Sequence, residues 1–225
     1  MEFLHPSTPA REIFKEDASI AFTDTGQAFI FCPARPDAVP LSAWLKNPLP
    51  HASHSEVDNS RGGHIFMVPT RPTDGVLEVE KEQMAQIATL WNIPAAASRH
   101  LLRSEGFGSF EQTVDGIVYR WYGLPVSLSR ELTVALRIVS CVGKPRKGGA
   151  DVLNTIIVCP KNILPLVGNC VRLYREKVNV ELPLPLQPLT LLVYLVGTAL
   201  DSWSSHLVGM VAVGQLHVSD GSLNA

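Results

Sequence analysis

The longest apolar stretch of the chain runs from Gln187 to Leu216, and its pattern predicts a helix. Between Pro188 and Met210, large apolar residues recur at spacings of three and four, which aligns them along one side of a helix. This stripe consists of Leu189, Leu192, Val193, Val196, Leu200, Trp203, Leu207 and Met210. We therefore expect an amphipathic helix that buries Leu192, Val196 and Trp203 against a folded domain.

A long apolar stretch of this kind could instead be a membrane-spanning helix. A spanning helix needs about 20 mostly apolar residues, and the run from Pro188 to Leu200 is shorter. Asp201 to His206, with the sequence "DSWSSH", then interrupts it, and a central Asp costs about 2.5–3.5 kcal/mol on insertion scales. We expect a helix packed in a domain. The alternatives are peripheral membrane contact and a span completed by residues outside this sequence.

Upstream of this helix, short β-prone runs predict several strands. Residues 18–32 are expected to form two short strands around a Thr-Asp-Thr-Gly turn, while residues 64–69 and 152–160 are typical of buried strands. Asp115 and Gly116 lie between two β-prone runs, and this dipeptide is a strong signal for a two-residue hairpin turn.

Helical patterns alternate with these strands. We expect helices at 42–46, at Leu77 to Trp91 and from Pro94 to Gly106, whereas residues 130–143 fit a strand or a helix. This interleaving predicts an α/β or α+β fold, a mixed sheet with flanking helices.

The domain boundaries follow from these elements. Residues 18–186 are expected to form a single domain, and residues 187–216 the apolar helix packed on it. Residues 1–17 and 217–225 are expected to be flexible ends.

Composition narrows the functional classes. The 225 residues are 46% hydrophobic and 18% charged, with a formal net charge of −2, so there is no electrostatic case for nucleic-acid binding. The N-terminus lacks the pattern of a signal peptide. The four cysteines form no CxxC pair, which argues against zinc and redox motifs. We expect reduced thiols, with Cys159 in the core, and a cytoplasmic location with or without membrane association.

Candidate chemistry is confined to a polar segment at residues 51–63. His54 and Asp58 have the HxxxD spacing in which a histidine serves as general base in some acyltransferases. Together with His51 and His64 they also form a possible metal-ligand set. The segment is polar and lies away from apolar walls that could shape an acyl pocket, so the favoured interpretation is a solvated loop, with no catalytic residue, no metal and no cofactor.

The order of segments resembles the N-terminal region of fungal CorA-like proteins, a magnesium transporter-like family. The resemblance is carried by residues 64–110, where a strand leads to a helix, a second helix and a Phe-Gly element, and by the preceding short helix in 41–50. Residues 186–207 resemble the apolar helix that carries an Asp/Asn-x-Trp element, here Asp201 to Trp203, and leads to the helical stalk of that family.

The resemblance, which covers Ala18 to Leu207, implies a regulatory type of domain. Conducting members carry a Gly-Met-Asn signature, whereas this chain has Gly209, Met210 and Val211. Val211 cannot supply the amide of that Asn, and no second span follows Leu216. The leading hypothesis is therefore a non-catalytic intracellular domain without a working pore, which either acts in assembly, as a homo-oligomer or with another protein, or is the remnant of a transporter. The alternatives are a small acyl-transfer or hydrolytic enzyme using His54 and Asp58, and a peripheral membrane protein.

Overall fold

The computed structural model describes most of the strands and helices of the chain. It covers residues 21–23, 26–32, 37–46, 64–71, 74–91, 93, 100–101, 108–114, 116–127, 133–143, 152–177 and 187–221. In the last segment it describes the side chains of residues 189–208 except 202 and 206.

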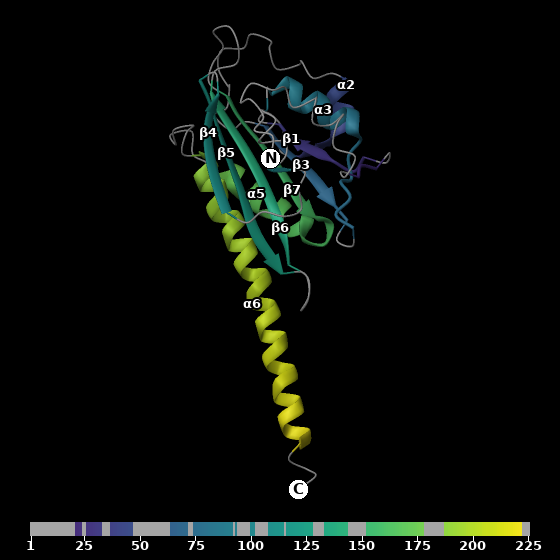
Figure 1. Ribbon diagram of the computed structural model, residues 1–225, viewed down its shortest axis with the longest axis vertical. Helices are drawn as coiled ribbons and strands as arrows, with labels where there is room; N and C mark the ends of the chain where they lie inside the picture. The colour runs from purple at the N-terminus through teal and green to yellow at the C-terminus, as the bar shows by residue number, and fades with distance from the viewer. Residues whose placement is uncertain are drawn as a thin grey trace, which may run out of the picture.

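One seven-stranded sheet organises these residues, with the strand order β2-β1-β3-β7-β6-β5-β4 (Figure 1). The strands β3 and β7 pair in parallel, and every other neighbouring pair is antiparallel. The strands are β1 (Phe29–Phe31), β2 (Ala38–Pro40), β3 (His64–Thr70), β4 (Gly108–Val114), β5 (Ile117–Ser127), β6 (Thr133–Gly143) and β7 (Val152–Pro160). The predicted mixed sheet is confirmed.

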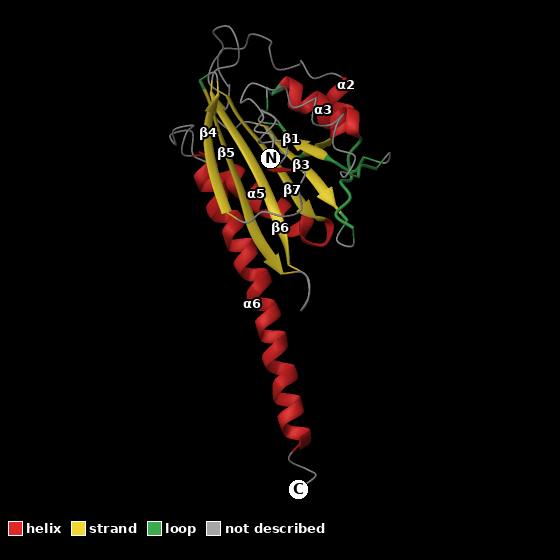
Figure 2. Ribbon diagram, in the orientation of Figure 1, coloured by secondary structure: helices red, strands yellow, loops and turns green. Residues whose placement is uncertain are grey.

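Helices flank the sheet on both faces (Figure 2). On one face lie α2 (Leu41–Lys46) and α3 (Lys81–Leu90); on the other lie α5 (Leu164–Lys177), which follows the short helix η1 (Lys161–Ile163), and α6 (Gln187–Gly221). This is the α/β arrangement of a single domain that the interleaved pattern predicts.

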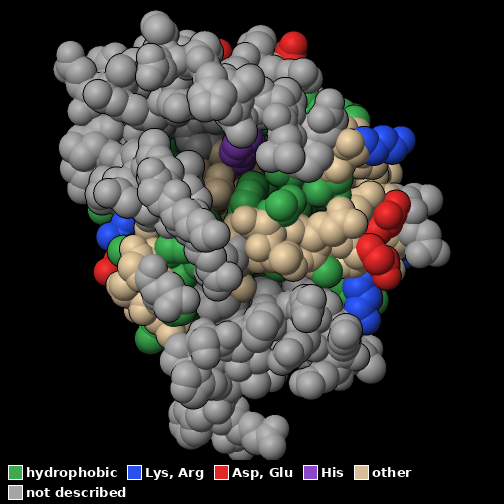
Figure 3. Space-filling model, turned by 90° about the horizontal axis from the view of Figure 1, so that it is seen from above, with side chains coloured by type: hydrophobic (Ala, Val, Ile, Leu, Met, Phe, Trp, Pro, Cys, Tyr) green, Lys and Arg blue, Asp and Glu red, His purple; other side chains and the backbone are tan. Residues whose placement is uncertain are grey.

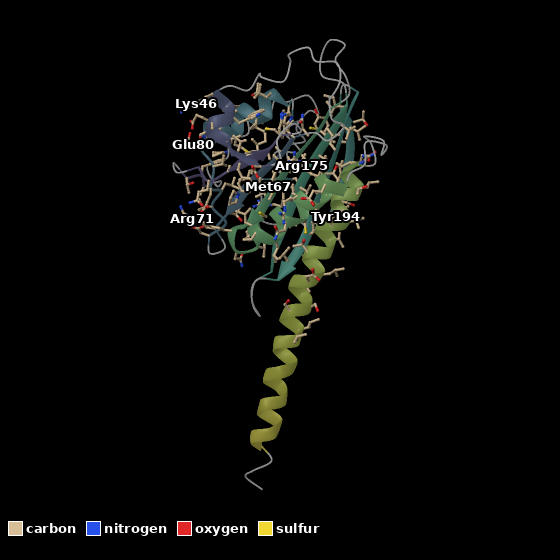
Figure 4. All side chains as sticks on the ribbon, turned by 180° about the vertical axis from the view of Figure 1, so that it is seen from behind. Lys46, Met67, Arg71, Glu80, Arg175 and Tyr194 are labelled. Carbon is tan, nitrogen blue, oxygen red and sulfur yellow. The ribbon has the colours of Figure 1, made fainter. Side chains whose placement is uncertain are left out.

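Each face of the sheet has its own hydrophobic core. Alternate residues of β3 point to opposite faces, so Phe66 and Val68 pack under α2 and α3, while Ile65 and Met67 pack against α5 and α6. Because both faces are covered, the central strands are apolar at successive positions. Arg175 fastens α5 to the sheet, since its Nη2 donates to the carbonyl oxygen of Cys32 at 2.6 Å (Figure 4).

The local turn and strand predictions agree with the structure at most positions. Gly116 has a φ of +78°, and Val114 pairs with Ile117, so β4 and β5 form the expected tight hairpin. Residues 133–143, for which the sequence left strand and helix open, form β6.

Two predictions upstream of β4 need correction. The helix expected from Leu77 begins at Lys81, because Leu77 instead forms isolated bridges with Phe22 and Thr70. Of the two strands expected within 18–32, the described residues form β1 and the single bridge at Phe22.

The predicted C-terminal helix is confirmed and is longer than expected. It runs without a break from Gln187 to Gly221, and its C-terminal part projects beyond the edge of the sheet (Figure 1). Within the part of the chain that the structure describes, no helix combines the length and the apolar character that crossing a bilayer requires.

Candidate functional site

Three of the four candidate residues, His51, His54 and Asp58, lie outside the described residues. The fourth, His64, is the first residue of β3. Its ring lies beside those of Trp44 and Trp91, with centroid distances of 5.6 and 6.4 Å. Among the described residues, no three His, Cys, Asp or Glu side chains gather as a metal site would require.

Across the sheet, His64 belongs to a row of polar side chains that the sequence did not reveal. The strand register aligns His64 with Asn154, Asn154 with Cys141, and Cys141 with Tyr119. The Cys141 thiol donates to the carbonyl oxygen of Asn154 at 3.4 Å. Burial raises the pKa of Cys141 to about 12, so the thiol stays protonated at neutral pH and is a poor nucleophile.

Cys159 resembles Cys141 in this respect. Its side chain is fully buried, which confirms the prediction of a core residue, and burial raises its pKa to about 12. Neither thiol is therefore suited to covalent catalysis.

A buried guanidinium on the same sheet face as His64 is a second feature that the sequence did not reveal. Arg137 of β6 is buried, and its Nε and Nη1 atoms have no hydrogen-bond partner among the described residues. Burial lowers its pKa to about 10, which leaves it charged at neutral pH. A charge at this position is hard to predict, because both neighbouring residues in β6 are apolar.

His100 lies in the electrostatic field of this cation. Its Nε2 donates to the carbonyl oxygen of Tyr122 at 3.1 Å. Burial, and to a smaller extent the charge of Arg137, lower the pKa of His100, although the backbone hydrogen bond opposes the shift. A neutral imidazole is therefore favoured, and the pair holds a single positive charge.

The helix α6 presents one side to the domain. Leu191, Leu195 and Ala199 are buried against α5 and the sheet. Polar contacts on the same helix support this packing: the Thr198 hydroxyl lies 2.7 Å from the Cys170 sulfur of α5, and Trp203 Nε1 donates to the carbonyl oxygen of Pro125 at 3.2 Å. Figure 4 shows Tyr194 on this part of α6.

The other side of α6 leaves large apolar residues exposed. The exposed fractions are 42% for Leu189, 71% for Val193, 63% for Leu200, 55% for Leu207 and 68% for Val208. Four of these belong to the stripe on which the sequence placed its buried residues. The predicted burial of Leu192, Val196 and Trp203 is met only in part, because all three are half-buried.

The physical reason is that the N-terminal part of α6 is apolar on every side. Spacings of three and four therefore fit more than one stripe, and the sheet selects the one that contains Leu191 and Leu195.

Charged side chains provide no comparable surface on the side of the molecule seen in Figure 3. There the described Lys, Arg, Asp and Glu residues are scattered among hydrophobic and other side chains. The exposed side of α6 is therefore the best-defined candidate for a functional surface among the described residues. Its side chains are apolar, so it would bind a partner through hydrophobic contacts.

Comparison with known proteins does not assign the chain to a family, because no protein-family model and no curated protein matches it.

Proposed function

We propose that this chain is a non-catalytic, intracellular domain of the CorA-like kind, without a working pore, that acts in assembly by presenting α6 to another protein. Two features support the proposal. The short helix α2 precedes β3, which leads to α3, and this is the order on which the resemblance rests. The Asp201-Ser202-Trp203 element lies inside an apolar helix that continues for almost another 20 residues.

The observation that carries the assembly role is the division of α6 into an anchored and an exposed side. The 35-residue helix is about 52 Å long at 1.5 Å per residue. Leu191 and Leu195 hold it on the sheet, while Val193 and Leu200 remain open to solvent on the other side. Exposed apolar surface of this extent marks an interaction site more often than an inert one.

Peripheral membrane contact is the second candidate, since the exposed residues of α6 would also enter a lipid surface. Interfacial helices are typically rich in Lys and Arg on their polar face, which attract anionic headgroups. The sequence of α6 contains no Lys or Arg. A protein surface is therefore the better match for its chemistry.

A photo-cross-linking experiment tests the proposal. A photoreactive benzoylphenylalanine placed at Leu200 in the full chain, expressed in cells, should form a protein–protein adduct visible as a larger band. The same residue at Ser205, which is exposed on the same helix and points away from the direction of Leu200, is the matched control and should form far less. Cross-linking to lipid alone, or equal adducts at both positions, would contradict the proposed role.

A further inference from the structure

Apolar residues on one side of α6, four of them exposed and two half-buried, follow a heptad repeat. Starting at Leu189, successive members of the stripe are spaced by four, three, four, three and four residues as far as Leu207. The members are Leu189, Val193, Val196, Leu200, Trp203 and Leu207. A mean spacing of 3.5 residues is the repeat of a left-handed coiled coil, in which the seam faces a partner helix along its whole length.

The exposed members of this stripe point away from the domain that anchors the helix, whereas Trp203 at its margin is half-buried and donates to the carbonyl oxygen of Pro125. Leu200 follows the buried Leu191 by nine residues, which is two and a half turns, so the two side chains project from opposite sides. A partner helix can therefore reach the stripe along about 27 Å, the length from Leu189 to Leu207, without displacing the sheet.

The positions beside the seam contain no Lys, Arg, Asp or Glu. On one side they are Thr190, Gly197 and Ser204, whose small side chains allow a second helix to approach closely. On the other side they are Leu192, Ala199 and His206. In coiled coils these flanking positions select a different partner by opposite charges. Here no carboxylate, ammonium or guanidinium group is available for such a partner to recognise, and two identical helices bring no such groups of like charge together.

We propose that the stripe pairs with the same stripe of a second copy of this chain, so that α6 forms the seam of a coiled-coil homodimer. This inference rests on the proposed assembly function and identifies the partner in that assembly as a second copy of the chain. A symmetric dimer uses one surface twice, which suits an apolar stripe that complements itself. The two sheets then lie on the outer sides of the paired helices.

The test measures the mass of the purified full chain by sedimentation equilibrium, in buffer without detergent, over about a hundredfold range of micromolar concentrations. We expect the mass to rise from that of one copy to that of two. Leu200→Glu places a charge in the seam and should weaken association at least tenfold, because two glutamates would face an apolar interface. Ser205→Glu introduces the same charge away from the seam and should associate like the unmodified chain.

Both substituted positions are exposed, so circular dichroism should show an unchanged fold for both variants. A chain that stays monomeric at every concentration, or equal effects of the two glutamates, would overturn the homodimer. The cross-linking experiment separates this failure from failure of the proposed function. An adduct at Leu200 with a different protein would leave the assembly role standing and refute self-association.

Discussion

Two leucines of α6 should respond very differently to the same substitution. Leu195 is fully buried between the helix and the sheet, whereas Leu200, five residues later, is 63% exposed. Both residues lie within one helix, so the change in intrinsic helix propensity, a small gain because alanine is the better helix former, is the same for each Leu→Ala change. The difference in unfolding free energy then reports the packing alone.

The expected magnitudes follow from burial. Leu195→Ala removes apolar atoms from a closed core beside Leu191 and Ala199 and leaves a cavity, which costs about 2–5 kcal/mol. Leu200→Ala removes atoms that water already reaches, and an exposed substitution of this kind changes stability by about 0.5 kcal/mol or less. Because a domain has about 5–15 kcal/mol of total stability, the first loss removes a large part of it and clearly lowers the urea midpoint.

Urea unfolding followed by circular dichroism measures both variants. The protein concentration should lie well below that of self-association, because dimer formation would add to the apparent stability of the unmodified chain. Equal costs for the two variants, or a larger cost for Leu200→Ala, would show that the helix packs by its other side and would refute the assignment of faces.

Further predictions concern the polar groups of the domain. Arg137→Met should raise the unfolding free energy by on the order of 1 kcal/mol or more, because it removes a desolvated charge with two unpaired nitrogen atoms; a loss of stability in urea unfolding would reveal a counter-charge. Trp203→Phe should cost about 0.5–1.5 kcal/mol, since it removes the hydrogen bond to Pro125 and keeps most of the apolar contact; no change would show that water replaces this bond. The lowered pKa of His100 means that the folded chain binds fewer protons than the unfolded chain, so stability should rise as pH increases toward 6.5 and this contribution should level off above it. His100→Asn should flatten that part of the stability profile measured by urea unfolding, and an unchanged slope would contradict the buried neutral imidazole. Cys141 should stay unmodified by an alkylating reagent in the native protein at pH 7 and react after unfolding, as mass spectrometry can show.

Local structure was largely predictable from the sequence. The turn at Gly116 requires a positive φ, which glycine adopts without steric cost. The dipeptide Asp115-Gly116 is therefore enough to predict the hairpin. The runs that form β3 and β7 are short, apolar and contain several β-branched residues, a composition that favours buried strands.

Long-range structure was not predictable in the same way. Residues 133–143 are apolar and β-branched but fit two conformations, and they form a strand because β5 and β7 supply hydrogen-bond partners on both sides. The polar row of Asn154 and Cys141 depends on the register between strands that no local pattern specifies.

The helix α6 shows most clearly which properties depend on local sequence and which depend on tertiary structure. Its sequence alone determines that it is helical, long and apolar, because these properties follow from residue type and spacing within one segment. Which side it buries is a matter of tertiary structure. An almost uniformly apolar helix offers several sides of similar hydrophobicity, and the domain covers the one that contains Leu195. The heptad stripe on the opposite side is visible in the sequence, but only the folded domain determines that Leu200, at its centre, stays exposed.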